Sequence, residues 1–172
     1  MLFIGIMYIW VVMVTRVPKI YLETSVFNFY FADDAPDKRD DTKRLFEEIR
    51  QGKYEPYTSD YVIDELVKCD EPKLSMMKKL LDDFDVIVLP ASAAAEMLAD
   101  VYVSEGIIPA KYRIDGLHVA VTSVSGLDFI VSFNFQHIVK RKTVELSEII
   151  NYRHGYKRIG IYSPTGVIED VE

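Results

Sequence analysis

Residues 112–121 read YRIDGLHVAV, and residues 129–135 read FIVSFNF. The first run places its apolar stripe at the i, i+3, i+4 and i+7 spacing of a helix packed into a core, at Ile114, Leu117, His118 and Val121. The second run opens with three strand-forming residues, 129–131. Two oxygen-bearing side chains accompany this helix and strand: Asp115 lies one position off the stripe, and Asn134 follows the strand.

The same alternation of apolar runs and helical patterns extends over the rest of the chain. We expect strands at 19–22, 54–58, 85–89 and 158–161, of which 85–89 is apolar enough for a buried parallel strand. Helices are predicted over 26–31, 37–51, 71–81 and 92–104, and another begins at Ser59 or Asp60. This order predicts an α/β fold of three layers, α/β/α, with a mostly parallel central sheet.

Length and composition exclude several classes of protein. A chain of 172 residues, 49% hydrophobic and 27% charged, is sufficient for one globular domain and is not disordered, so we expect a single domain over 17–172. One cysteine, Cys69, forms no internal disulfide, which favours a reducing, cytoplasmic compartment. The net charge of −7 opposes diffuse binding to nucleic acid, so any such contact must be local.

Residues 1–16 form an apolar N-terminal extension. The apolar run from Leu2 to Val14 is shorter than the roughly 20 residues that cross a bilayer, and no basic residue precedes it. We interpret the extension as an artefact of start assignment, with translation beginning at Met7 or Met13. A signal or anchor is the alternative interpretation, and no membrane partner is expected.

Acidic side chains recur where apolar strands give way to helices. Ligands of open parallel sheets bind beyond the carboxyl ends of the strands, where Glu23, Glu65 and Asn134 are predicted to lie. Converging carboxylates repel one another unless a cation compensates, and hard oxygen ligands suit Mg²⁺ or Mn²⁺. We therefore predict that Glu23, Glu65 and Asp115 bind the metal and that Asn134 assists them, an arrangement suited to phosphodiester hydrolysis.

Four segments together resemble PIN domains: KIYLETSV (19–26), residues 59–65, IDGLHVA (114–120) and SFNFQHI (132–138). The resemblance covers about Lys19 to Val167 and implies a PIN-like fold and a Mg²⁺- or Mn²⁺-dependent endoribonuclease, similar to VapC-type toxins that a cognate antitoxin inhibits. It places Glu23 where the family normally has its first Asp, and Glu65 and Asp115 at the second and third acids. Asn134 stands where many members have a fourth acid. The longer Glu23 side chain departs from the pattern and bears on activity, because Mg²⁺ tolerates little distortion of its shell.

Several neighbouring residues have a structural and a functional interpretation. Thr24, Ser25 and Asn28 can orient the first acid, but Thr24 and Ser25 suit helix capping equally well. His137 can approach a substrate phosphate or simply face solvent, and we interpret His118 as a core histidine. From His137 to Arg158 six basic residues stand against two acids, a balance of +4, so Lys140 and Arg141 belong either to an RNA-facing patch or to a solvated loop.

Three functions remain open from the residues. The first is a metal-dependent endoribonuclease, for which the resemblance implies an RNA substrate, a toxin role, a cognate antitoxin and a homodimeric state. The second is a degenerate PIN domain that binds RNA or protein without cutting. The third, a phosphatase-like or nucleotide-binding protein, is disfavoured because the chain has no glycine-rich phosphate loop.

Overall fold

The structure is a computed structural model that describes residues 16–169. The predicted N-terminal extension therefore lies, apart from Arg16, outside the described residues. Within the described part of the chain, no helix combines the length and the apolar character needed to cross a membrane.

Five parallel strands form one sheet in the order β3-β2-β1-β4-β5. The α/β class and the parallel sheet are thus confirmed. The strands are β1 (Lys19–Leu22), β2 (Glu55–Ser59), β3 (Ile87–Leu89), β4 (Phe129–Val131) and β5 (Gly160–Tyr162).

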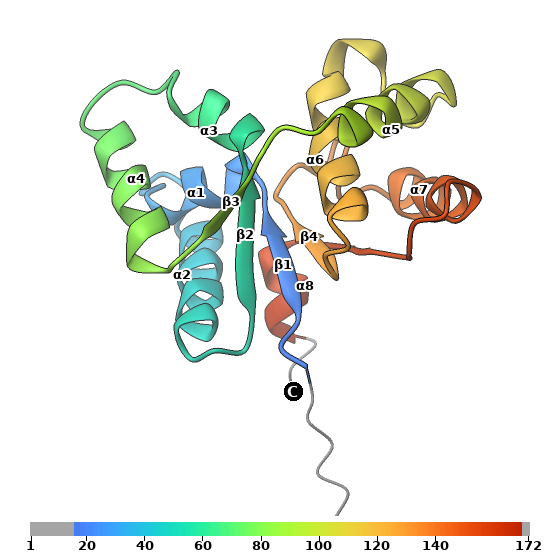
Figure 1. Ribbon diagram of the computed structural model, residues 1–172. Helices are drawn as coiled ribbons and strands as arrows, with labels where there is room; N and C mark the ends of the chain where they lie inside the picture. Colours follow the sequence, from blue (N-terminus) through green and yellow to red (C-terminus); the bar gives the residue numbers. More distant parts are fainter. Residues whose placement is uncertain (1–15, 170–172) are drawn as a thin grey trace, which may run out of the picture.

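Helices cover both faces of the sheet, as the three-layer prediction requires (Figure 1). They are α1 (Thr24–Tyr30), α2 (Pro36–Arg50), α3 (Asp60–Leu66), α4 (Lys73–Asp83), α5 (Ala93–Ser104), α6 (Arg113–Val124), α7 (Arg141–Arg153) and α8 (Pro164–Glu169), with a 3₁₀ turn at Ala110–Tyr112. Helices α1, α2 and α4 lie on one side, and α5, α6 and α7 on the other. Helix α8 returns to the first side and packs against α2.

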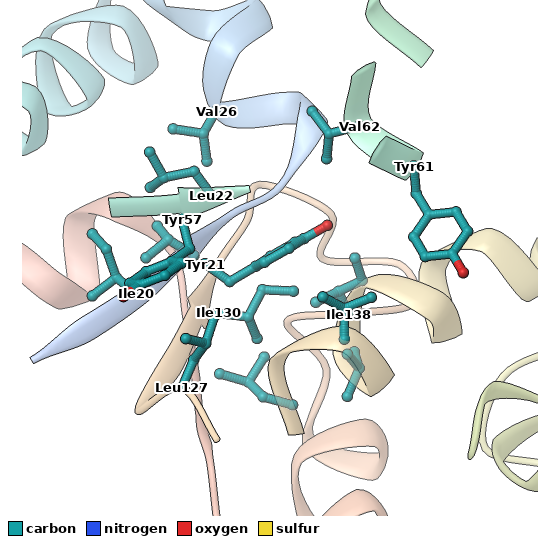
Figure 2. Close-up of a cluster of buried hydrophobic side chains, with 14 of the residues drawn as sticks. Ile20, Tyr21, Leu22, Val26, Tyr57, Tyr61, Val62, Leu127, Ile130 and Ile138 are labelled. Carbon is teal, nitrogen blue, oxygen red and sulfur yellow. The ribbon is translucent and has the colours of Figure 1, made fainter. Parts of the chain in front are cut away.

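Strand β1 organises the core because it lies at the centre of the sheet and is fully buried at Ile20, Tyr21 and Leu22. Successive side chains of a strand point to opposite faces. Leu22 lies toward Val26 of α1, while Tyr21 lies beside its register partner Ile130 (Figure 2). The Tyr21 hydroxyl therefore reaches the side of the sheet that α6 covers.

The prediction of a buried strand at 85–89 is wrong about its burial and its length, as β3 shows. It spans only three residues at the edge of the sheet, and Ile87 and Val88 are 43% and 41% exposed. An apolar run indicates that a strand is hydrophobic, but it does not show whether the strand has neighbours on both sides. Strand β3 is more exposed than expected because it has a partner strand on one side only.

The C-terminal third contains more helix than the sequence pattern indicates. The basic segment between β4 and β5, interpreted above as a patch or loop, forms the 13-residue helix α7. Its buried face consists mainly of polar residues, which conceal the helical periodicity: Thr143, Ser147, Ile150 and Asn151. Helix α8 was likewise not predicted.

The direction of the strand order reverses beside β1, which makes this place the topological switch point of the sheet. The chain builds outward from β1 to β2 and β3, then crosses to β4 on the other side of β1 and continues to β5. At such a reversal, the connections that follow the two central strands run to opposite sides of the sheet. Ligands of open parallel sheets usually bind there, beyond the carboxyl ends of these strands. Here those ends are followed by Glu23 and by Ser132 to Asn134.

Candidate metal centre

Glu23 follows β1 and is held at the switch point by residues from both sides of it. Its backbone N–H donates to the Val131 carbonyl at 3.1 Å, and its side chain is 6% exposed. The carboxylate atom Oε2 accepts hydrogen bonds from Ser25 at 2.5 Å and from Ser132 at 2.7 Å. Both bonds go to Oε2, so Oε1 is the oxygen left for another ligand.

Glu65 projects from α3 toward the same point. Its Oε2 accepts from the Thr24 hydroxyl and lies 3.1 Å from Nε2 of His118. Burial opposes ionisation of this carboxyl, but the hydrogen bonds and charge of His118 and the bond from Thr24 outweigh burial and lower the pKa of Glu65. Glu65 is therefore held as a carboxylate.

One ligand atom each from Glu23, Glu65 and His118 lies within 4.8 Å of the others. They come from three places in the fold, since Glu23 directly precedes α1, Glu65 lies on α3 and His118 lies on α6. His118 is 1% exposed and makes two hydrogen bonds, as a core histidine would, but one of them goes to a predicted metal ligand. One feature of the sequence indicates the contact between His118 and the acids: His118 follows Asp115 by three residues, so both lie on one helix face.

Asp115 lies next to this group without belonging to the set of three. It is 9% exposed, and its Oδ2 is buried without a hydrogen-bond partner. Burial raises the pKa of Asp115, and the charge of Glu23 acts in the same direction. The Asn134 side chain and the charges of His118 and His137 oppose this rise in pKa. Asp115 therefore lies within electrostatic reach of both Glu23 and His118.

Asn134 and His137 form a turn beside the acids. The Asn134 side-chain oxygen accepts from the His137 backbone N–H at 3.0 Å, and the Asn134 backbone N–H donates to Ser132 at 2.9 Å. The His137 ring stacks on Tyr112 with centroids 4.1 Å apart, and its Nε2 is buried without a partner. His137 therefore packs at the amino-terminal end of α6, against its N-cap residue Tyr112, and is not a freely solvated residue.

The supporting residues predicted near Glu23 contact the acids directly or through α1. Helix α1 begins at Thr24 with Glu23 as its N-cap residue, and no side chain caps it, so the capping interpretation of Thr24 and Ser25 is wrong. Their hydroxyls bond the two acids instead, and Ser25 also accepts from the Phe133 backbone N–H at 2.9 Å. Asn28 donates to the Thr24 carbonyl at 3.2 Å and so acts within α1.

The basic segment does not form one patch. Lys140 and Arg141 lie at the start of α7, while Arg153 ends the helix about 18 Å away, at 1.5 Å per residue. Arg141 pairs with Glu145, and the basic residues after the helix pair with other acids, Lys157 with Asp128 and Arg158 with Glu148. Only the Lys140 end adjoins the turn that carries Asn134 and His137.

A buried chain of hydrogen bonds connects the centre to the core of the sheet. Nδ1 of His118 lies 2.9 Å from the Tyr21 hydroxyl, which lies 2.6 Å from Oγ of Ser59. Tyr21 is fully buried, and burial raises the pKa of its hydroxyl, which therefore stays protonated. The orientation of His118 is thus set from strands β1 and β2.

Comparison with known proteins adds no relative to this description. The chain matches no model of a protein family and no curated protein.

Proposed function

We propose that this protein is a divalent-metal-dependent endoribonuclease with a PIN-like active centre. The observation that carries the proposal is the convergence of Glu23 and Glu65, with the unpartnered Oδ2 of Asp115 beside them, at the switch point of a parallel sheet. Buried carboxylates that approach one another are unfavourable without a compensating cation. The donor set therefore fits Mg²⁺ or Mn²⁺, held by Glu23, Glu65 and Asp115.

The surrounding side chains set the geometry of these ligands. Ser25 and Ser132 fix Glu23, and Thr24 and His118 fix Glu65, each through Oε2. Such contacts orient a ligand before substrate arrives, and their loss generally weakens metal sites about 10–100-fold. A divalent ion held there supplies charge neutralisation and Lewis acidity toward a phosphate oxygen.

An RNA strand finds suitable groups on the turn that follows β4. Phe135, next to Asn134, is 53% exposed and offers a ring on which an unpaired base can stack. Lys140, at the end of the same turn, is exposed and suits a backbone phosphate. These contacts favour single-stranded RNA, whose bases are accessible for stacking.

The proposal is tested by incubating purified protein with structured and single-stranded RNAs in Mg²⁺, Mn²⁺ or EDTA, beside Asp115→Asn and Glu23→Asp variants. We expect cleavage that requires metal and falls more than about 100-fold in Asp115→Asn, beyond the loss usual for an outer contact. Metal-independent cleavage, or full activity in Asp115→Asn, would overturn the assignment.

The second function, a degenerate PIN domain that binds without cutting, is favoured by one feature of the centre. The added methylene of Glu23 is accommodated by two serine hydroxyls, which hold its carboxylate toward β4. Inactive wild-type protein, combined with an active Glu23→Asp variant, would support this function.

The toxin role, the cognate antitoxin, the homodimer and the cytoplasmic location belong to the same proposal. Induced expression in bacteria should arrest growth for wild-type protein but not for Asp115→Asn. Co-expression of a small neighbouring gene product should relieve the arrest and co-purify with the chain. Sedimentation of the purified protein measures its oligomeric state directly.

A further inference from the structure

In the scheme of oxygen ligands, His118 serves only as a hydrogen-bond partner of Glu65. The residue is 1% exposed, and its Nε2 points at the carboxylate of Glu65 across 3.1 Å. Nε2 also belongs to the group of ligand atoms, shared with Glu23 and Glu65, that lie within 4.8 Å of one another. A nitrogen atom therefore stands in the same cluster as the oxygens assigned to the metal.

The spacing of these atoms suits neighbouring ligands of one ion. Ligands at about 2.1 Å from an octahedral ion stand roughly 3 Å apart when they are adjacent. The 3.1 Å between Nε2 of His118 and Oε2 of Glu65 matches that separation. The same distance also suits a hydrogen bond, so geometry at this one contact is compatible with both roles.

The environment of the other ring nitrogen favours a ligand role. A metal-binding histidine usually donates its second N–H to a fixed acceptor, which sets the tautomer and the ring orientation. Nδ1 of His118 faces the Tyr21 hydroxyl at 2.9 Å, and that hydroxyl can donate onward to Ser59 at 2.6 Å. Metal binding would exchange the hydrogen bond between Nε2 and Glu65 for coordination, because with the proton on Nδ1 the lone pair of Nε2 is free to bind the ion.

An independent observation points to a ligand at this place. Asp115 lies one helical turn before His118, is nine-tenths buried, and keeps Oδ2 without a hydrogen-bond partner. Buried carboxylate oxygens are nearly always paired, so an orphaned one within electrostatic reach of Glu23 calls for a cation.

We propose that His118 joins Glu23, Glu65 and Asp115 in a mixed oxygen–nitrogen ligand set that selects Mn²⁺ over Mg²⁺. Imidazole nitrogen is a poor ligand for Mg²⁺, which prefers oxygen, but it is an ordinary ligand for first-row transition metals. The inference rests on the proposed function, since it concerns the same centre, and it assigns His118 as a direct ligand. We expect Mn²⁺ to bind at least about 10-fold more tightly than Mg²⁺.

Pulsed electron paramagnetic resonance of Mn²⁺ bound to the full-length protein tests the assignment without relying on activity. Coordinated imidazole produces a nitrogen hyperfine coupling. We expect a ¹⁴N coupling that changes to ¹⁵N when the protein is grown with ¹⁵N-histidine. The chain has three histidines, His118, His137 and His154, so two variants identify the ligand.

His118→Gln is the informative variant because glutamine keeps an N–H that can bond Glu65 but removes the imidazole. The coupling should disappear and Mn²⁺ affinity should fall more than about 10-fold, while Mg²⁺ affinity changes less. His137→Gln is the matched control, because His137 adjoins the same centre, and it should retain the coupling. Should His118→Gln fail to fold, retention of the coupling in a His137→Gln, His154→Gln double variant, together with the ¹⁵N label, still supports the assignment.

Three results would overturn the proposal, and they separate it from the proposed function. Mn²⁺ binding without a histidine coupling would mean that His118 only holds Glu65, and metal-dependent RNA cleavage in the same samples would leave the nuclease intact. A coupling that is lost in His137→Gln but kept in His118→Gln would show that His137, and not His118, is the ligand. Absence of Mn²⁺ binding would remove the ligand assignment, and absence of Mg²⁺ binding as well would remove the metal dependence of the nuclease.

Discussion

Helix α6 contributes to two buried polar clusters with opposite character. Its amino-terminal half enters the acidic cluster, which we define as Glu23, Glu65, Asp115 and His118. Its carboxyl-terminal half enters the neutral cluster, in which Tyr102 donates to Asn151 at 2.5 Å and Asn151 donates to Ser123 at 2.9 Å. Hydrogen bonds connect each cluster to a tyrosine hydroxyl and a serine hydroxyl.

The two clusters differ in how completely their polar groups are paired. The neutral cluster carries no charge and links α5, α6 and α7 through mutual donors and acceptors. The acidic cluster brings carboxylates together and leaves Oδ2 of Asp115 without a partner. A paired neutral network stabilises a fold, whereas an under-paired charged one disfavours it unless a ligand binds. We therefore interpret the first cluster as structural and the second as functional.

Asn151→Ala should produce the largest change in stability. It leaves the hydroxyls of Tyr102 and Ser123 without their main partner and opens a cavity beneath α7, so unfolding free energy should fall by roughly 2–4 kcal/mol. Chemical denaturation measures that loss, and calorimetry measures Mn²⁺ affinity of the folded variant. An equally large loss of metal affinity would contradict the separation of the two clusters.

Tyr21→Phe and Tyr102→Phe form a matched pair. Each deletes one buried hydroxyl with two partners, so each should lower stability by about 1–3 kcal/mol. Only Tyr21→Phe should also weaken Mn²⁺ binding, by about 10-fold, because it releases Nδ1 of His118. Thermal denaturation and metal titration of both variants test this; equal metal affinities would show that Tyr21 has no role at the centre.

Ser132→Ala removes a hydroxyl that donates to Glu23 at 2.7 Å and accepts from the Asn134 backbone at 2.9 Å. Metal affinity should fall about 10-fold, while stability changes by about 1 kcal/mol. Calorimetric titration gives the first quantity and urea denaturation the second. Ser147→Ala, on the buried face of α7, is a suitable control and should leave metal affinity unchanged.

Asp115→Asn should have the smallest effect on stability, and the opposite sign. The pKa of Asp115 is raised by burial, so its ionisation disfavours the folded state above that pKa. In metal-free protein the variant should therefore melt slightly higher than wild type at neutral pH. The gain should shrink as pH falls through the folded pKa and vanish below the unfolded value of about 3.9. A constant difference across that range would assign the effect to something other than charge.

Much of the acidic cluster was predictable because its acids occupy topologically defined positions. An acid that directly follows a central parallel strand must lie at the carboxyl edge of the sheet, whatever the packing, and Glu23 does so. The contact of His118 with Glu65 was not predicted, because a position on an apolar face is equally consistent with burial among hydrocarbons and with such a contact. The partner comes from α3, 53 residues earlier, and sequence spacing carries no information on that distance.

The neutral cluster was not predictable, and α7 shows the reason. Its buried positions recur with helical spacing, but Thr143, Ser147 and Asn151 are polar, so a pattern of hydrophobicity cannot reveal them. Their burial is possible because each has a partner: Thr143 donates to the His137 carbonyl, Ser147 donates to the Val144 carbonyl, and Asn151 accepts from Tyr102. A polar buried face thus looks like a solvated segment until tertiary contacts are known.

The short edge strand β3 bears on how the protein behaves at high concentration. Its exposed residues Ile87 and Val88 are of the kind that promote strand pairing between molecules, which leads to aggregation. The strand spans three residues, and Pro90, which follows directly, has no N–H to offer a foreign strand. A template this short holds few intermolecular hydrogen bonds, so the sheet can end in apolar residues and still resist fibril growth.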